Sequence, residues 1–131
     1  MDRDPSAPPP TSRLVSRGEI YWVEPDETRG SVPGEPHPHL VISEDLFNHS
    51  RIGTVVVCRL TSNPARAIEP GNVLLEAGEG GLPKRSVVVV SHLSSIYKAR
   101  LGELVGRLSD ERVELVLSGL RLQQASFFAR R

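Results

Sequence analysis

The sequence predicts a mainly β protein with a single domain, in which about six short strands and one C-terminal helix form a small, strongly bent barrel or sandwich. The chain has 131 residues, the usual size of one domain. Short β-branched runs alternate with Gly- and Pro-rich breaks over most of its length, and apolar residues at helical spacing occur once, near the C-terminus. No helical segment separates the strand-like runs, which argues against a parallel α/β fold.

Six runs have the composition of β-strands, because they combine β-branched, aromatic and other apolar residues between turn signals. They cover residues 19–23, 40–43, 53–61, 72–76, 86–93 and 103–108. The third run is almost continuously apolar, so we expect it to be buried on both faces. Gly71 and the segment Gly78-Glu79-Gly80-Gly81 interrupt the later runs and are interpreted as turns.

The helix is predicted to begin after Ser109. This residue is a suitable N-cap, and the acidic residues Asp110 and Glu111 suit the positive end of a helix dipole. Apolar residues then follow the i, i+3, i+4, i+7 spacing at Val113, Val116, Leu117 and Leu120. Gly119 should weaken this helix by about 1 kcal/mol relative to Ala.

Proline marks two segments outside the regular elements. Residues 1–15 are rich in Pro and too poor in apolar surface to offset the entropy of ordering, so we expect a disordered arm and one domain over residues 16–131. A second Pro-rich stretch, from Pro25 to Pro38, predicts a long loop. Long loops without structure of their own are usually functional or disordered, which makes this one a candidate site.

Composition excludes several classes of function. Lys plus Arg number 16 and Asp plus Glu number 16, so any nucleic-acid site must be a local patch. The three Phe, two Tyr and one Trp are too few for aromatic platforms that stack single strands. The single Cys58 excludes an internal disulfide and a Cys-based zinc site. Without a membrane span or secretory signal, the predicted location is the cytoplasm.

The motif His37-Pro38-His39 is the most unusual local feature. Pro38 favours an extended conformation for His37, and side chains at i and i+2 of an extended segment share a face. Two imidazoles that titrate near about pH 6.5 suit acid-base chemistry, although a solvated loop bordered by Pro is the commoner reason for such spacing. A metal site would need a third ligand from His49, His92 or Cys58, and none has a recognisable spacing.

Hydroxyl and basic side chains offer further candidates. Thr61-Ser62 ends the third run, where hydroxyls can reach a ligand, and Ser31 follows Gly30 in the long loop. No nucleophile-elbow motif supports acyl transfer. Basic residues that could bind phosphates, or simply form a solvated face, gather near the last two runs at Lys84, Arg85, Lys98, Arg100 and Arg107.

Taken in order, these segments resemble the MazF/PemK family of toxin endoribonucleases, from about Arg17 to Leu120. The similar segments are Arg17-Gly18-Glu19-Ile20-Tyr21-Trp22-Val23, Gly30-Ser31, His37-Pro38-His39-Leu40-Val41-Ile42-Ser43, Thr61-Ser62, Gly81-Leu82-Pro83-Lys84-Arg85-Ser86-Val87-Val88-Val89 and Gly106-Arg107-Leu108-Ser109. The resemblance implies an SH3-like barrel, a homodimer without cofactors, and metal-independent, sequence-selective cleavage of single-stranded RNA. It also implies a cognate antitoxin that covers the RNA groove.

The resemblance further assigns roles to individual residues. Thr61 matches the family's catalytic Thr, whereas His37 stands where the family has its catalytic Arg, and His92 stands where the family often has Gln. Our hypothesis is that His37 is the general acid or base, that Thr61 binds a phosphate oxygen, and that His39 or a nearby Arg supplies the positive charge of the missing Arg. The residues expected to bind RNA are Ser31, His39, Ser62, Lys84, Arg85 and His92.

Two other functions remain open from the sequence. The His substitution could mark a catalytically inactive SH3-like module that only binds a partner. The same barrel also occurs in a gyrase-directed toxin.

Overall fold

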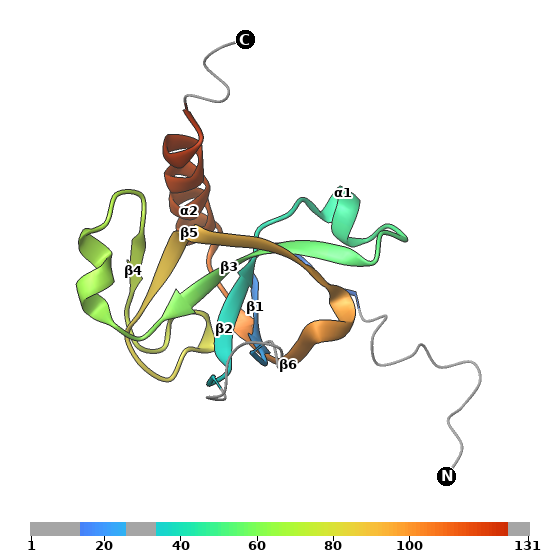
Figure 1. The fold of residues 1–131 in the computed structure, drawn as a ribbon, viewed down its shortest axis with the longest axis horizontal. Helices are drawn as coiled ribbons and strands as arrows, with labels where there is room; N and C mark the ends of the chain where they lie inside the picture. The colour runs from blue at the N-terminus through green and yellow to red at the C-terminus, as the bar shows by residue number, and fades with distance from the viewer. Residues whose placement is uncertain (1–13, 26–33, 126–131) are drawn as a thin grey trace.

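The structure is a computed structural model that describes residues 14–25 and 34–125 (Figure 1). Its strands are β1 (Glu19–Val23), β2 (His37–Val41), β3 (Thr54–Thr61), β4 (Val73–Leu75), β5 (Ser86–Tyr97) and β6 (Leu101–Arg107). Its helices are α1 (Asp45–Asn48) and α2 (Asp110–Gln123), with short 3-10 turns η2 (Pro64–Ile68), η3 (Glu79–Gly81) and η4 (Lys98–Arg100).

The described strands form one antiparallel sheet of six strands in the order β4-β5-β3-β2-β1-β6. Strand β5 arches across the sheet, and α2 lies beside the bend of β5 (Figure 1). This arrangement confirms the predicted mainly β fold with a C-terminal helix. No helix among residues 14–25 and 34–125 has both the length and the apolar character needed to cross a bilayer.

The middle of the sheet is buried on both faces, because it separates two apolar cores. Val57 packs in one core with Val41 and Tyr21, while the adjacent Cys58 packs in the other with Leu40. Both Val57 and Cys58 are fully buried, so the prediction that the third run is buried on both faces is confirmed. Apolar residues of α2 cover the core that contains Cys58, and burial raises the pKa of its thiol to about 12.

A register shift in β5 bends the sheet. Cys58 pairs with Leu93 and Leu60 pairs with Val88, so residues 89–92 of β5 lie opposite the single residue Arg59. Such a bulge leaves backbone groups outside the ladder and increases the local bend. The side chain of Asn72 compensates by accepting a hydrogen bond from the backbone N–H of Val90 at 3.0 Å.

Three elements differ from the sequence prediction. Strand β2 begins at His37 and not at Leu40. The pairing of β2 with β3 ends at His39, so Pro38, which has no backbone N–H, removes no hydrogen bond from that ladder. Strand β5 continues to Tyr97, and its second half pairs with β3. The one-turn helix α1 has too few residues to show a helical period.

The predicted arm lies outside the described residues except for Leu14 and Val15. Val15 is fully buried in the core that contains Val57. The packed domain therefore includes this residue.

Helix α2 begins where predicted and makes an unusually close contact at Gly119. The hydroxyl of Ser109 accepts a hydrogen bond from the backbone N–H of Arg112 at 3.2 Å, as expected of an N-cap. A Cβ atom added at Gly119 would lie 2.1 Å from the carbonyl oxygen of Gly71, which has φ +82°. Position 119 therefore requires glycine, because α2 approaches the turn at Gly71 too closely for a side chain, although glycine has a low helix propensity.

We expect Gly119→Ala to lower the free energy of unfolding by about 1–3 kcal/mol, because the added methyl group forces the helix away from Gly71. Urea denaturation followed by circular dichroism measures the change. The exposed neighbour Ser118→Ala is the control and should change stability by less than about 0.5 kcal/mol. A Gly119→Ala protein as stable as the parent would show that this contact does not constrain the helix.

Candidate active site

The two imidazoles of the His37-Pro38-His39 motif lie on one face of the sheet. His37 pairs with Val23 of β1, and His39 lies between Tyr21 of β1 and Arg59 of β3. Side chains directly opposite each other in an antiparallel ladder share a face and lie close together. The structure therefore brings His37, His39 and Arg59 to one face.

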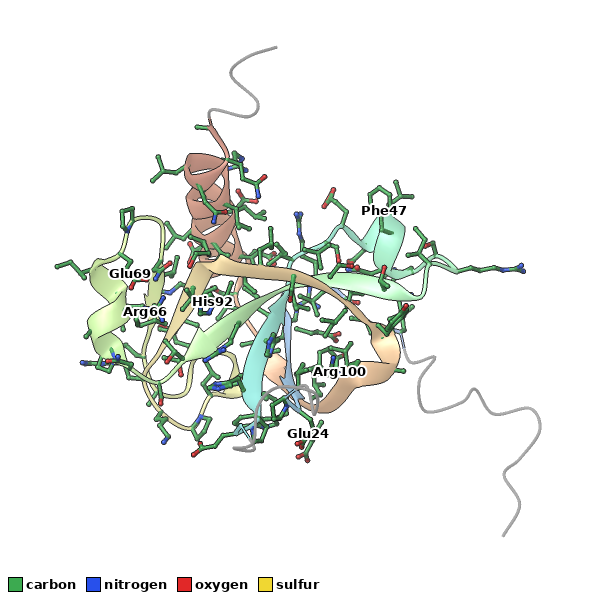
Figure 2. All side chains as sticks on the ribbon, viewed as in Figure 1. Glu24, Phe47, Arg66, Glu69, His92 and Arg100 are labelled. Carbon is green, nitrogen blue, oxygen red and sulfur yellow. The ribbon has the colours of Figure 1, made fainter. Side chains whose placement is uncertain are left out.

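These side chains line a hollow of about 900 Å³. His92 reaches it from the bulged part of β5, and Arg100 reaches it from the turn before β6. Figure 2 shows His92 on the β5 side, and Arg100 close to Glu24, whose carbonyl oxygen accepts a hydrogen bond from the Arg100 guanidinium at 2.7 Å. Three imidazoles and two guanidinium groups thus line one cavity.

Two nitrogen atoms in this hollow are buried without a hydrogen-bond partner among the described residues. They are the Nε atom of Arg59 and the Nδ1 atom of His92. A buried polar group without a partner costs about 1–3 kcal/mol, and more if it is charged. Such atoms are uncommon in folded proteins, where ordered water or a bound group usually supplies the hydrogen-bond partner.

Burial lowers the pKa of all three imidazoles in the hollow, because desolvation disfavours the charged ring. The guanidinium of Arg59 lowers each pKa further by charge repulsion. Opposing contributions are smaller: Glu35 acts on His37, and the carbonyl oxygen of His37 accepts a hydrogen bond from Nδ1 of His39 at 2.9 Å. At pH 7 the imidazoles are therefore mostly neutral and can accept a proton.

His92 lies beside an ion pair on the outer side of the hollow. Arg66 and Glu69 of the η2 region are joined at 2.6 Å, and Figure 2 shows both near His92. Their charges act on the pKa of His92 in opposite directions, Arg66 lowering it and Glu69 raising it. The side-chain amide of Asn72 donates hydrogen bonds to the Arg66 carbonyl oxygen and to Glu69, at 2.9 Å and 3.0 Å. Asn72 therefore links this pair to the bulge that carries His92.

Thr61 lies at the end of β3, on the same face as Arg59 but outside the residues that line the hollow. Its hydroxyl oxygen accepts a hydrogen bond from the backbone N–H of Asn63 at 3.3 Å. The β2–β3 pairing ends at His39 and Arg59, and beyond it His37 pairs with Val23 of β1 whereas Thr61 pairs with Val87 of β5. Ser62 is exposed on the segment that follows.

The other predicted RNA-binding residues lie elsewhere. Lys84 and Arg85 are exposed and outside the lining of the hollow, and Arg85 forms an ion pair with Glu76 at 3.2 Å. Ser31 lies outside the described residues. The predicted basic group is dispersed, since Lys98 instead donates to the carbonyl oxygen of Ser50 at 3.2 Å. Of that group, Arg100 lines the hollow.

Arg59 is the site residue that the sequence reasoning missed. A signal was present, because Arg59 is the only charged residue within the apolar run of residues 54–61. A charge inside a strand with buried neighbours on both sides needs a reason to be there. The composition of the run does not show which strands flank it, and so it does not reveal the two histidines that face this residue.

Metal ligands are not grouped in the described part of the chain. Among residues 14–25 and 34–125, no three His, Cys, Asp or Glu side chains come together in a way that could hold a metal ion.

Comparison with known proteins links this fold to one family. Residues 16–123 match the family described as PemK-like, MazF-like toxin of type II toxin-antitoxin system. Endoribonuclease MazF2 of Mycobacterium bovis is 41% identical over 108 residues, which are 82% of this chain and 95% of the relative. Endoribonuclease EndoA of Bacillus subtilis is 30% identical over 112 residues, which are 86% of this chain and 96% of the relative.

Solved structures share the fold at lower identity. An endoribonuclease from Mycobacterial species, in complex with its cognate antitoxin, superposes with a TM-score of 0.68 at 22% identity over 85% of this chain and 95% of its own. A crystal structure of MazF from Deinococcus radiodurans gives a TM-score of 0.68 at 23% identity over 86% of this chain and 98% of its own.

The lowered imidazole pKa values predict that stability falls in acid. Below about pH 6.5 the unfolded chain takes up protons that the folded hollow resists, so the free energy of unfolding decreases as pH falls from 7.5 to 5.5. We expect His39→Gln to reduce this decrease, as measured by urea denaturation at the two pH values. His49→Gln, which removes an imidazole outside the hollow, is the matched control. A His39→Gln protein that loses as much stability as the parent between these pH values contradicts the assignment.

Proposed function

Because the chain belongs to the PemK-like, MazF-like toxin family of type II toxin-antitoxin systems, we propose that it is a toxin endoribonuclease that cleaves single-stranded RNA. The hollow supports this proposal, since it holds His37 and His39 beside Arg59 on the face that Thr61 also shares. Phosphodiester cleavage needs a proton acceptor, a proton donor and donors to the phosphoryl oxygens, and these side chains are of the required kinds.

In the proposed reaction the ribose 2'-oxygen attacks the adjacent phosphorus. His37, mostly neutral at pH 7, accepts the 2'-hydroxyl proton as the new 2'-O–P bond forms. The P–O5' bond breaks, and the leaving 5'-oxygen takes a proton from water, which gives a 2',3'-cyclic phosphate and a 5'-hydroxyl end, while His37 returns its proton to the solvent. No change of oxidation state occurs, and the proton transfers need only side chains and water.

Two further residues support this step. Thr61, at the end of β3, would donate a hydrogen bond from its hydroxyl to a non-bridging phosphate oxygen. His39 would bind the RNA backbone beside His37, with which it shares a strand face. The roles of Ser31, Ser62, Lys84, Arg85 and His92 in holding RNA are proposed on the family resemblance.

The proposed partners follow from the family. A small cognate antitoxin would bind this toxin, since a solved structure with the same fold is an endoribonuclease in complex with its cognate antitoxin. We propose that the toxin acts as a homodimer in the cytoplasm and uses no metal. Neither an inactive binding module nor a gyrase-directed toxin is favoured, because the relatives that match most of the chain are named endoribonucleases.

Incubation of the purified protein with a long single-stranded RNA in EDTA is expected to give discrete fragments with 5'-hydroxyl ends. His37→Ala should slow cleavage by about 100-fold or more, the usual size of a general acid-base contribution. His49→Ala, at the residue that follows α1 and lies outside the hollow, is the matched control and should cut as fast as the parent. Intact RNA with the parent protein would reject the nuclease, and full activity of His37→Ala would remove His37 from the reaction.

A further inference from the structure

We propose that Arg59 binds the RNA backbone in this site, with its guanidinium donating to the non-bridging oxygens of a phosphodiester. This inference rests on the proposed function, because it assigns the residue that carries the permanent positive charge of the nuclease site. It concerns a residue of β3, whereas the catalytic histidine is proposed on β2.

The position of Arg59 is the first argument. It lies opposite His39 on β2, and on its other side β5 bulges through residues 89–92. The side chain therefore lies between the two imidazoles of β2 and the imidazole of His92, and all of these line the same hollow. A phosphate bound by Arg59 would lie within the cavity that His37 also faces.

The unmet hydrogen-bonding capacity of Arg59 is the second argument. Its Nε–H is buried and has no acceptor among the described residues. An arginine presents Nε–H and a terminal N–H as a planar fork, which matches two oxygens of a phosphate. The buried Nδ1 of His92 likewise has no hydrogen-bond partner among the described residues. A bound phosphodiester and its flanking ribose carry groups that can serve as hydrogen-bond partners for both nitrogen atoms.

The charges around the hollow are the third argument. No ion pair joins Arg59 to a carboxylate in the described part of the chain, whereas Arg17, Arg66, Arg85, Arg112 and Arg121 all have carboxylate partners. Glu24 and Glu35 also line the hollow and are exposed. The nearby Arg100 adds a second positive charge, and its guanidinium is held by the Glu24 carbonyl oxygen. Among the described residues, two guanidinium groups and two carboxylates therefore line the hollow, but both carboxylates are exposed and neither forms an ion pair with Arg59.

The division of labour between side chains is the fourth argument. Imidazoles that are mostly neutral at pH 7 move protons but contribute little fixed charge. A phosphodiester needs a fixed charge that does not titrate, and a guanidinium supplies it at every physiological pH. Arg59 adjoins the imidazoles and provides this charge without competing for their protons.

Binding of a fluorescent single-stranded DNA oligonucleotide tests the proposal without cleavage, because DNA has no 2'-hydroxyl group. Fluorescence anisotropy is measured between 50 mM and 200 mM salt for the parent, Arg59→Met, Arg59→Lys and Arg121→Met. We expect Arg59→Met to weaken binding by about 10-fold or more and to reduce the slope of log affinity against log salt by about 0.7. Arg121→Met removes an exposed charge from α2 and should bind as the parent does.

Arg59→Lys separates charge from geometry and serves if Arg59→Met does not fold, as checked by circular dichroism. It should keep the salt slope of the parent but bind more weakly, since an ammonium group lacks the planar fork. Parent-like affinity and salt slope in folded Arg59→Met, or parent-like affinity in Arg59→Lys, overturn the proposal. If the parent cuts RNA while binding does not depend on Arg59, this inference alone fails. If binding depends on Arg59 but RNA stays intact, the nuclease assignment fails instead.

Discussion

The extra length of β5 opposite Arg59 is the constraint on which the rest of the structure depends. Residues 89–92 pass a single residue of β3, so the two strands cannot continue flat and the sheet bends. The bend lets one sheet of six described strands enclose two apolar cores, one of them covered by α2. Asn72 stabilises the bulge, because its side chain accepts a hydrogen bond from the backbone N–H of Val90, which has no partner in the neighbouring described strands.

The same bulge creates the chemistry of the hollow. It carries His92 to the hollow that Arg59 and His39 also line. Burial and the guanidinium together keep the imidazoles mostly neutral, so the site separates a fixed positive charge from proton-accepting groups. Separate groups for charge and for proton transfer are what cleavage of a phosphodiester by its own 2'-hydroxyl requires.

The sequence predicted the features that depend on residues close together along the chain. It missed the features that depend on which strands pair and in which register. The strands and α2 were predictable because their periodicity is local, and the shared face of His37 and His39 follows from their i, i+2 spacing. The pairing of His39 with Arg59 depends on which strands adjoin, and the run from Ser86 to Tyr97 does not show where its extra residues lie. The convergence of His37 and Thr61 on one phosphate stays a prediction, because the β2–β3 pairing ends at His39 and Arg59.

The most direct measurement is the nuclear magnetic resonance spectrum of the Arg59 Nε–H and the imidazole nitrogens, recorded as a single-stranded DNA oligonucleotide is added. If the guanidinium and the imidazoles of the hollow hold one phosphodiester, the signals of Arg59, His37 and His39 shift together along one binding curve, and the Arg59 Nε–H exchanges more slowly with water. Saturation with the oligonucleotide that leaves these signals unmoved, while those of exposed Arg85 shift, would contradict the account.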